Sequence, residues 1–384
     1  MRITRVERDM SDYSWLGKSY GNVLQEKLYI AYREARKGKR STVNEQSFEA
    51  NLDKNLMLLK IDLLNYTYTP SRGTAHIIHK PVIREIFAAP FRDRVVHHYI
   101  YDAVYDYLDN RFIYDSYSCR VGKGTLMGIR RLDYHMRAVS RNYARKVYIL
   151  KFDLRGYFMS LPRKELYERA MWWLDRQYAG KLDSIEYKLL KYLWYQIIMD
   201  DPVRGVKRKG RLSDWDLLPD SKSLFCQPSG VGIVIGNLTS QLLSNIYLDM
   251  LDRFVVYDLG YKHYGRYVDD FYIVVTEEEL PQVLRDTEAI ELFLASKRLT
   301  LHPNKRMITT PEMGVPFLGA IVHQGYVLPG KRLQRNFRRA CIEVQAGAKD
   351  IQVFASYLGH VEHYNKIKFL TDTLEKTIGM DYKL

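Results

Sequence analysis

The first hundred residues change their hydrophobic pattern several times. Apolar residues recur at helical spacing over 23–36 and over 48–64, which predicts two amphipathic helices in a mostly helical first part of the chain. Residues 66–70 then break the pattern with a proline, and the alternation over 76–86 predicts a β-hairpin. We expect a further helix to run up to about Leu108.

Two apolar strand patterns in the middle of the chain lead to acidic residues. The first is Val147-Tyr-Ile-Leu-Lys-Phe-Asp153, which ends in an aspartate and precedes a helical pattern over 163–174. The second lies within 264–275, where aromatic and β-branched residues flank Asp269 and Asp270 and predict a hairpin with this pair at its turn. A strand, an aspartate, a tight turn and a helix together place the first aspartate at the rim of a sheet.

The other segments are predicted from similar patterns. A polar, basic stretch at about 200–227 is expected to be an exposed insertion or loop, with or without a short helix. A glycine-rich turn follows it and leads into a helix. The expected helices are 175–199, 239–251, 277–298 and a basic helical region from 331, and the expected hairpin is 315–328.

Composition favours a nucleic-acid partner. The chain has 384 residues, enough for two or three domains, and 59 Lys and Arg against 45 Asp and Glu give a net charge of +14. Charge that serves only solubility is the alternative. Three cysteines far apart in sequence argue against a zinc site or a disulfide framework. Residues 1–10 lack an apolar signal core, and no apolar run approaches the ~20 residues of a membrane span, so we expect no membrane partner and a cytoplasmic location.

The acidic residues suggest metal chemistry. Asp269 and Asp270 repel one another unless a cation or solvent offsets their charges. Mg²⁺ prefers oxygen ligands and commonly uses one or two carboxylates together with substrate phosphates. With Asp153 on a neighbouring strand, three carboxylates could hold two Mg²⁺ ions for in-line attack of a hydroxyl on a phosphate. An ordinary acidic turn is the alternative for the Asp pair alone.

These motifs resemble those of a known family. Asp153 with Phe158 five residues on, followed by Tyr267-Val-Asp-Asp270, resembles the palm of polymerases, and Tyr-x-Asp-Asp is typical of reverse transcriptases. The segment Ile235-Gly-Asn-Leu-Thr-Ser-Gln241 resembles the form in diversity-generating retroelement reverse transcriptases, where most retroelement polymerases carry Gln-Gly and then Ser-Pro. The resemblance covers roughly residues 45–370, and its shorter matches are Arg92–His98, Lys222–Phe225 and Ser356–His360.

The resemblance implies a fold and an activity. The fold would be an α+β right-hand polymerase, with a helical extension and fingers over 1–150, a palm with an antiparallel sheet over 151–328, and a small helical thumb over 329–384 without a nuclease, maturase or integrase region. The activity would be RNA-directed DNA synthesis from dNTPs with two Mg²⁺ ions, which Mn²⁺ could replace. The partners would be a template-repeat RNA, a DNA or RNA primer and a small basic oligomeric accessory protein, and the cDNA, copied with errors opposite adenines, would diversify a target gene.

The resemblance also suggests roles for single residues. Asp153, Asp269 and Asp270 would be the catalytic metal ligands, and Lys305 would protonate the leaving pyrophosphate unless it is only a surface lysine. Arg84 would contact the triphosphate of the incoming nucleotide, and Arg92 and Arg94 are further candidates for phosphate contacts. Phe158 would lie under the nucleotide sugar. Gly236, Ser240 and Gln241 belong to the element expected under the forming base pair.

Several alternatives stay open. A salt bridge with Asp93 or Asp102 is the other explanation for Arg92 and Arg94, and a core position is the other explanation for Phe158. The family often has a lysine where this chain has Val82, which puts one contact with the triphosphate in question, although Lys80 could make that contact instead. The rival functions are a group II intron-like or phage-defence reverse transcriptase and, further away, a non-catalytic RNA-binding module.

Overall fold

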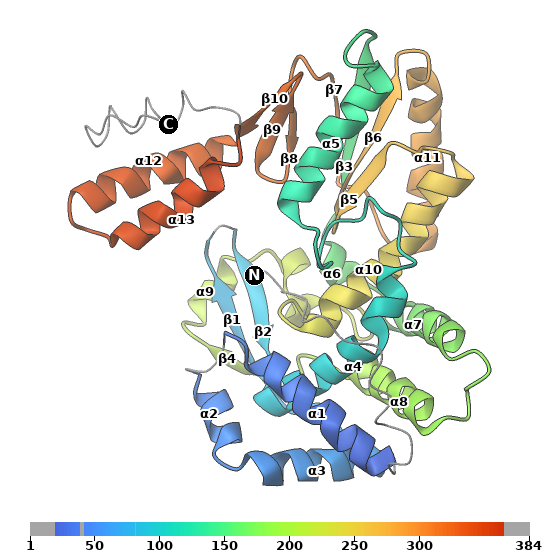
Figure 1. Ribbon diagram of the computed structural model, residues 1–384, viewed down its shortest axis with the longest axis vertical. Coiled ribbons are helices and arrows are strands. Elements are labelled where there is room, and N and C mark those ends of the chain that lie inside the picture. The colour runs from blue at the N-terminus through green and yellow to red at the C-terminus, as the bar shows by residue number, and fades with distance from the viewer. Residues whose placement is uncertain (1–19, 39–41, 81, 365–384) are drawn as a thin grey trace. The chain divides into compact units, whose positions relative to one another are not determined.

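The computed structural model describes residues 20–38, 42–80 and 82–364, and the remaining residues are drawn as a grey trace in Figure 1. Its contacts divide the chain into two compact units. The first combines the described residues of Met1–Ile113, Arg155–Leu251 and Leu294–Thr300. The second combines those of Tyr114–Leu154, Asp252–Phe293 and Leu301–Leu384. The mixture of helices and sheets expected from the sequence is confirmed, whereas the three consecutive domains stay a prediction.

The first unit begins with helices. They are α1 (Tyr20–Arg36), α2 (Val43–Glu49), α3 (Leu52–Leu64) and α4 (Phe91–Asp109). The single helix predicted over 48–64 is therefore divided, because Asn51 adopts φ −135° and ψ 47°, outside the helical region. The apolar stripe of α1, which includes Leu24 and Leu28, is fully buried, as the helical spacing predicts.

The predicted hairpin is present as β1 (Thr74–Ile78) and β2 (Arg84–Ala88), an antiparallel pair. A short strand, β4 (Lys207–Lys209), adds to β1 in parallel. The expectation that 200–227 is an exposed loop is only partly correct. β4 is exposed, but Trp215, from α9 (Ser213–Asp216), and Leu224 are buried in one cluster with Phe87 of β2. The sequence did not predict this burial, because the stretch is polar on average and its few apolar side chains do not show a regular spacing.

The other helices of the first unit agree only in part with the predicted pattern. They are α6 (Tyr157–Ser160), α7 (Arg163–Gln177), α8 (Ile185–Met199) and α10 (Leu238–Arg253), whose last two residues count with the second unit. The helix expected over 175–199 begins only at Ile185, because residues 178–184 are not helical, and the short helix α6 was not predicted. Two short 3-10 turns, Asp220–Lys222 and Leu224–Cys226, precede the glycine-rich loop.

The second unit is built on an antiparallel sheet. Its strand order is β5-β6-β3-β7, from β5 (Tyr264–Tyr267), β6 (Asp270–Thr276), β3 (Val147–Asp153) and β7 (Met307–Thr309). Helix α5 (Thr125–Ser140) packs on one face, where Leu132 and Met136 meet Ile149 and Val274 in a buried cluster. Figure 1 shows α5 and α11 (Leu280–Ser296) on either side of these strands.

The C-terminal part of the second unit adds a small sheet and two helices. The hairpin expected over 315–328 is a sheet of β8 (Val315–Phe317), β9 (Ala320–His323) and β10 (Tyr326–Pro329), in the order β10-β9-β8. The basic region is helical as predicted, in α12 (Lys331–Gln345) and α13 (Ile351–Val361), which share buried Phe337, Cys341 and Val361. The part of the predicted thumb beyond residue 364 lies outside the described residues, as does Pro81 of the predicted hairpin.

Candidate active site

Pairing of β3 with β6 brings two of the three predicted carboxylates opposite each other, with Asp269 adjacent in sequence to one of them. In the antiparallel register Asp153, the last residue of β3, lies opposite Asp270, the first residue of β6. The Leu154 amide donates to the Asp269 carbonyl oxygen at 3.0 Å, which ties the end of β3 to the turn. Directly opposed residues of an antiparallel pair have Cβ atoms about 5 Å apart. Segments more than a hundred residues apart in sequence therefore meet at one edge of the sheet.

Each of the two opposed carboxylates is paired with a lysine. The Lys305 Nζ lies 2.9 and 3.0 Å from the two carboxylate oxygens of Asp153. The Lys151 Nζ lies 2.9 Å from Asp270 Oδ1. Sequence reasoning selected Lys305 but missed Lys151. The signal was present, because Lys151 precedes Asp153 by two residues on a strand and so projects from the same face.

Burial perturbs the protonation of Asp270. Removal from water is the largest effect and raises the pKa of Asp270 to about 6, while Lys151 opposes the rise and the negative charges of Asp153 and Asp269 add to it. A carboxyl whose environment disfavours its charge to this degree is a recurrent feature of functional sites. A cation bound at this edge would favour the ionised form.

The donor set fits a hard divalent cation in its chemistry. The three carboxylates supply oxygen ligands of the kind that Mg²⁺ prefers. Oδ1 of Asp270 is buried and accepts no aligned hydrogen bond, despite its ion-pair distance to Lys151. Over the described part of the chain, no three Asp, Glu, His or Cys side chains converge into a ready metal cage. In their present positions Asp153 and Asp270 are paired with ammonium groups instead.

The three arginines predicted to bind phosphate lie in the first unit and differ in their surroundings. Arg84, the first residue of β2, is exposed. Arg94 Nε donates to the Ala89 carbonyl at 2.9 Å, and burial lowers the pKa of Arg94. Arg92 takes the salt-bridge alternative: it pairs with Asp93 at 3.2 Å and with Asp62 at 2.7 Å. We therefore regard Arg84 as the better candidate for a phosphate contact.

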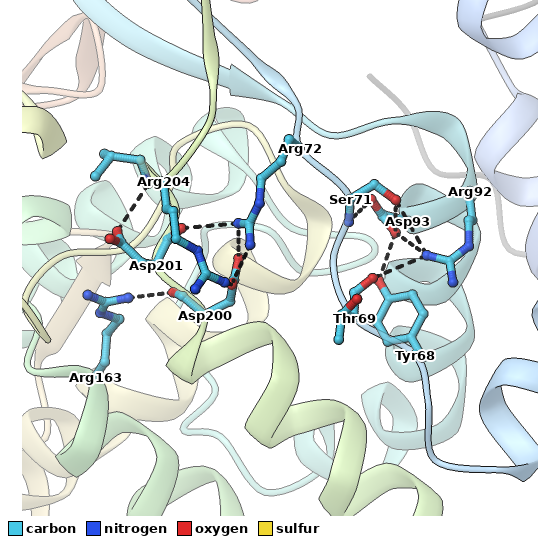
Figure 2. A network of polar contacts seen from close by, with 11 residues as sticks. Tyr68, Thr69, Ser71, Arg72, Arg92, Asp93, Arg163, Asp200, Asp201 and Arg204 are labelled. Carbon is cyan, nitrogen blue, oxygen red and sulfur yellow. Dashed lines mark hydrogen bonds and ion pairs between the residues drawn. The ribbon is translucent and has the colours of Figure 1, made fainter.

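Figure 2 shows how Arg92 is held. Its guanidinium also donates to the Thr69 carbonyl at 3.2 Å and lies 4.7 Å from the centre of the Tyr68 ring. Tyr68 in turn donates to the buried carboxylate of Asp93 at 3.0 Å. A second cluster in the same view joins Arg72 to Asp200 at 2.9 Å. The first network gives the buried carboxylate of Asp93 the partners that a buried charge needs.

The glycine-rich loop approaches a strand of the protein itself. The Phe87 amide of β2 donates to the Ile235 carbonyl at 2.9 Å, and the next residue, Gly236, has φ 129°. A Cβ at Gly236 would lie 2.5 Å from the Phe87 carbonyl oxygen. Gly236, which the resemblance places at the forming base pair, thus lies close to β2 in the described residues. Along the following helix Ser240 is buried and Gln241 is exposed.

Phe158 is half-buried rather than fully in the core. Its ring lies edge-on to that of Tyr157, 5.3 Å between centroids, and packs against the cluster that contains Trp215 and Leu224. Phe158, Gly236, Ser240, Gln241 and the three arginines belong to the first unit, whereas Asp153, Asp269, Asp270 and Lys305 belong to the second. The roles of all these residues stay predictions.

None of the helices in the described residues combines the length and apolar character needed to cross a membrane.

The sequence matches no family model, and it matches no curated protein.

Among solved structures the chain is similar to fungal telomerases. It matches apo telomerase from Candida tropicalis at 12% identity and a TM-score of 0.47, over 81% of this chain and 59% of that chain. The corresponding values are 11%, 0.49, 81% and 54% for Candida tropicalis telomerase with a fragment of telomeric RNA. They are 10%, 0.44, 83% and 58% for Candida albicans telomerase with such a fragment. This chain therefore spans between 54% and 59% of the length of these telomerase chains.

Proposed function

We propose that the chain is an RNA-directed DNA polymerase, a reverse transcriptase that extends a primer by nucleotidyl transfer. The observation that carries the proposal is the register that sets Asp153 opposite Asp270, with Asp269 tied to the end of β3. Carboxylates brought opposite each other at a sheet edge suit two-metal phosphoryl chemistry. The net charge of +14 suits a nucleic-acid substrate.

The proposal gives each side chain of the site a task. Asp153, Asp269 and Asp270 would hold two Mg²⁺ ions, or Mn²⁺ in their place. When bound, such ions activate the primer hydroxyl and neutralise charge on the leaving pyrophosphate. Lys305 would hold a proton beside Asp153 for the pyrophosphate, and Lys151 would balance the charge of Asp270. Arg84 would contact the triphosphate of the incoming nucleotide.

Primer extension tests the activity. Purified full-length chain would be given an annealed RNA template, a DNA primer, dNTPs and Mg²⁺. We expect extension by the wild type, and loss of roughly 100- to 1,000-fold in rate for Asp269→Asn, because the variant loses one of the charged carboxylates that would hold the cations, and with it their electrostatic stabilisation of the transition state. Asp258→Asn is the matched control, since Asp258 is an exposed aspartate of the same unit, and it should keep full activity. Chelation with EDTA should stop extension, and added Mg²⁺ should restore it.

The polymerase proposal fails if the wild type makes no product with cognate RNA and accessory protein present. It also fails if Asp269→Asn is as active as Asp258→Asn. A chain that binds RNA tightly but extends nothing would be the non-catalytic RNA-binding module.

We further propose, from the resemblance of residues 235–241, that the enzyme belongs to the diversity-generating lineage. It would copy a template-repeat RNA with a small basic oligomeric accessory protein as partner, and its cDNA would diversify a target gene. Sequencing the cDNA made on a defined RNA tests this, because errors should concentrate opposite template adenines. Errors spread evenly over the four bases would instead favour a group II intron-like or phage-defence enzyme.

A further inference from the structure

The turn that carries the acidic pair has a strained residue at its centre. Val268, immediately before Asp269, has φ 55°, in the left-handed region. A β-branched side chain is a genuine outlier there, because its Cβ approaches the backbone too closely. Such a conformation persists only where neighbouring groups impose it.

Two hydrogen bonds hold the backbone of Val268 on both sides. The Val268 amide donates to Ser118 Oγ at 3.2 Å. The Val268 carbonyl accepts from Arg266 Nη1 at 3.0 Å. The following carbonyl, of Asp269, accepts from the Leu154 amide at 3.0 Å. The backbone around the acidic pair is therefore bonded at consecutive peptide groups.

Arg266 is itself locked in place by a buried ion pair. Its Nε and Nη2 donate to the two carboxylate oxygens of Asp252, each at 2.6 Å. The exposed fractions of these side chains are 1% for Arg266 and 0% for Asp252. Nη2 also donates to Ser116 Oγ at 3.2 Å, and Tyr264 donates to Asp252 at 2.7 Å. A forked guanidinium can make these bonds at once, whereas the single ammonium of lysine cannot.

We propose that Arg266, held by Asp252, is a positioning residue that imposes the left-handed backbone of Val268 and thereby sets the carboxylates of Asp269 and Asp270 for catalysis. It touches neither substrate nor reacting atoms in this scheme and acts through the turn. The inference rests on the proposed polymerase function for its kinetic consequence only. The backbone consequence stands without it.

The test compares four full-length proteins in primer extension and in hydrogen exchange: wild type, Arg266→Lys, Val268→Asn and the double variant. Arg266→Lys should lower kcat about 10- to 100-fold, because small misplacement of catalytic groups is costly, while the dNTP KM changes less than about threefold. The Val268 amide should exchange at least about tenfold faster, as local opening becomes easier. Asparagine tolerates the left-handed region, so the double variant should recover most of the lost kcat and amide protection.

A matched control separates positioning from loss of a buried ion pair. Arg169 pairs with Asp249 at 2.8 Å, with exposed fractions of 14% and 0%, in the first unit. Arg169→Lys should lower the midpoint of urea unfolding as Arg266→Lys does, without the loss of kcat or the faster exchange at Val268.

Three results would each overturn the inference. They are an unchanged exchange rate at Val268 in Arg266→Lys, a loss of kcat equal to that of Arg169→Lys, and a double variant as impaired as Arg266→Lys alone. If the wild type makes no DNA, the proposed function fails, and the exchange measurement still decides whether Arg266 holds the turn.

Discussion

The buried charge of Asp270 should make the metal-free protein less stable as the pH rises. The folded state raises the pKa of this carboxyl from 3.8 to about 6, mainly through burial. The folded state therefore binds the proton more tightly than the unfolded state. Stability is greatest below pH 4 and falls as the pH rises through about 6. The full difference corresponds to about 3 kcal/mol.

Asp270→Asn removes this dependence and isolates its size. Between pH 4.5 and pH 7.5, the titration of Asp270 should lower the free energy of unfolding of the wild type by about 2 kcal/mol. The substitution leaves Lys151 without its carboxylate partner, which costs stability. Because the variant has no titrating carboxyl at this position, that cost enters the comparison equally at both pH values. We therefore expect the free energy of unfolding of Asp270→Asn, relative to wild type, to rise by about 2 kcal/mol from pH 4.5 to pH 7.5.

Urea unfolding followed by tryptophan fluorescence provides the assay, with EDTA present at both pH values to keep the protein free of divalent metal. Asp258→Asn is the control, because its carboxylate is exposed, and its difference from wild type should be the same at both pH values. A difference between Asp270→Asn and wild type that stays constant within about 0.5 kcal/mol would refute the buried-charge reasoning.

Three further predictions concern the first unit, and urea unfolding measures each. Gly236→Ala should cost about 2 kcal/mol or more, because its Cβ would lie 2.5 Å from the Phe87 carbonyl oxygen and its φ is 129°. Gly260→Ala, with φ 83° and nothing within 4 Å, should cost only about 1 kcal/mol. Burial lowers the pKa of His97 to about 3, so the folded state favours the neutral form. The free energy of unfolding should therefore fall by about 2 to 3 kcal/mol between pH 7 and pH 4.5 through this group, and it should fall less in His97→Asn. Glu85→Ala should cost about 3 kcal/mol, because this fully buried carboxylate accepts three hydrogen bonds.

Each of these has an outcome that contradicts it. Equal costs for Gly236→Ala and Gly260→Ala would show that the loop does not press on β2. An acid response of His97→Asn identical to that of wild type would remove His97 as its source. For Glu85 the control is Glu312→Ala, an exposed site. If both variants unfold at the same urea concentration, Glu85 does not anchor the segment from Trp215 to Leu224.

Local patterns in the sequence determined the individual elements. The apolar run over Val147–Asp153 predicted β3 with its observed bounds. The placement of Asp269 and Asp270 at a hairpin turn was also correct, since β5 ends at Tyr267 and β6 begins at Asp270. Strand and turn preferences act over a few residues, so they can be read without knowledge of the fold.

Long-range packing decided what local patterns could not. Only the β3–β6 register shows that Asp153 faces Asp270. Only the side-chain contacts show that Lys151 pairs with Asp270. Only tertiary contacts show that Arg92 is held in a salt-bridge network. Only they show that Trp215, from a polar stretch of sequence, is buried in one hydrophobic cluster with Phe87 of β2. The physical reason is that the partner of a buried charge or ring is chosen by the fold. A charged residue reads the same in sequence whether its neighbour in space is solvent, a phosphate or a carboxylate.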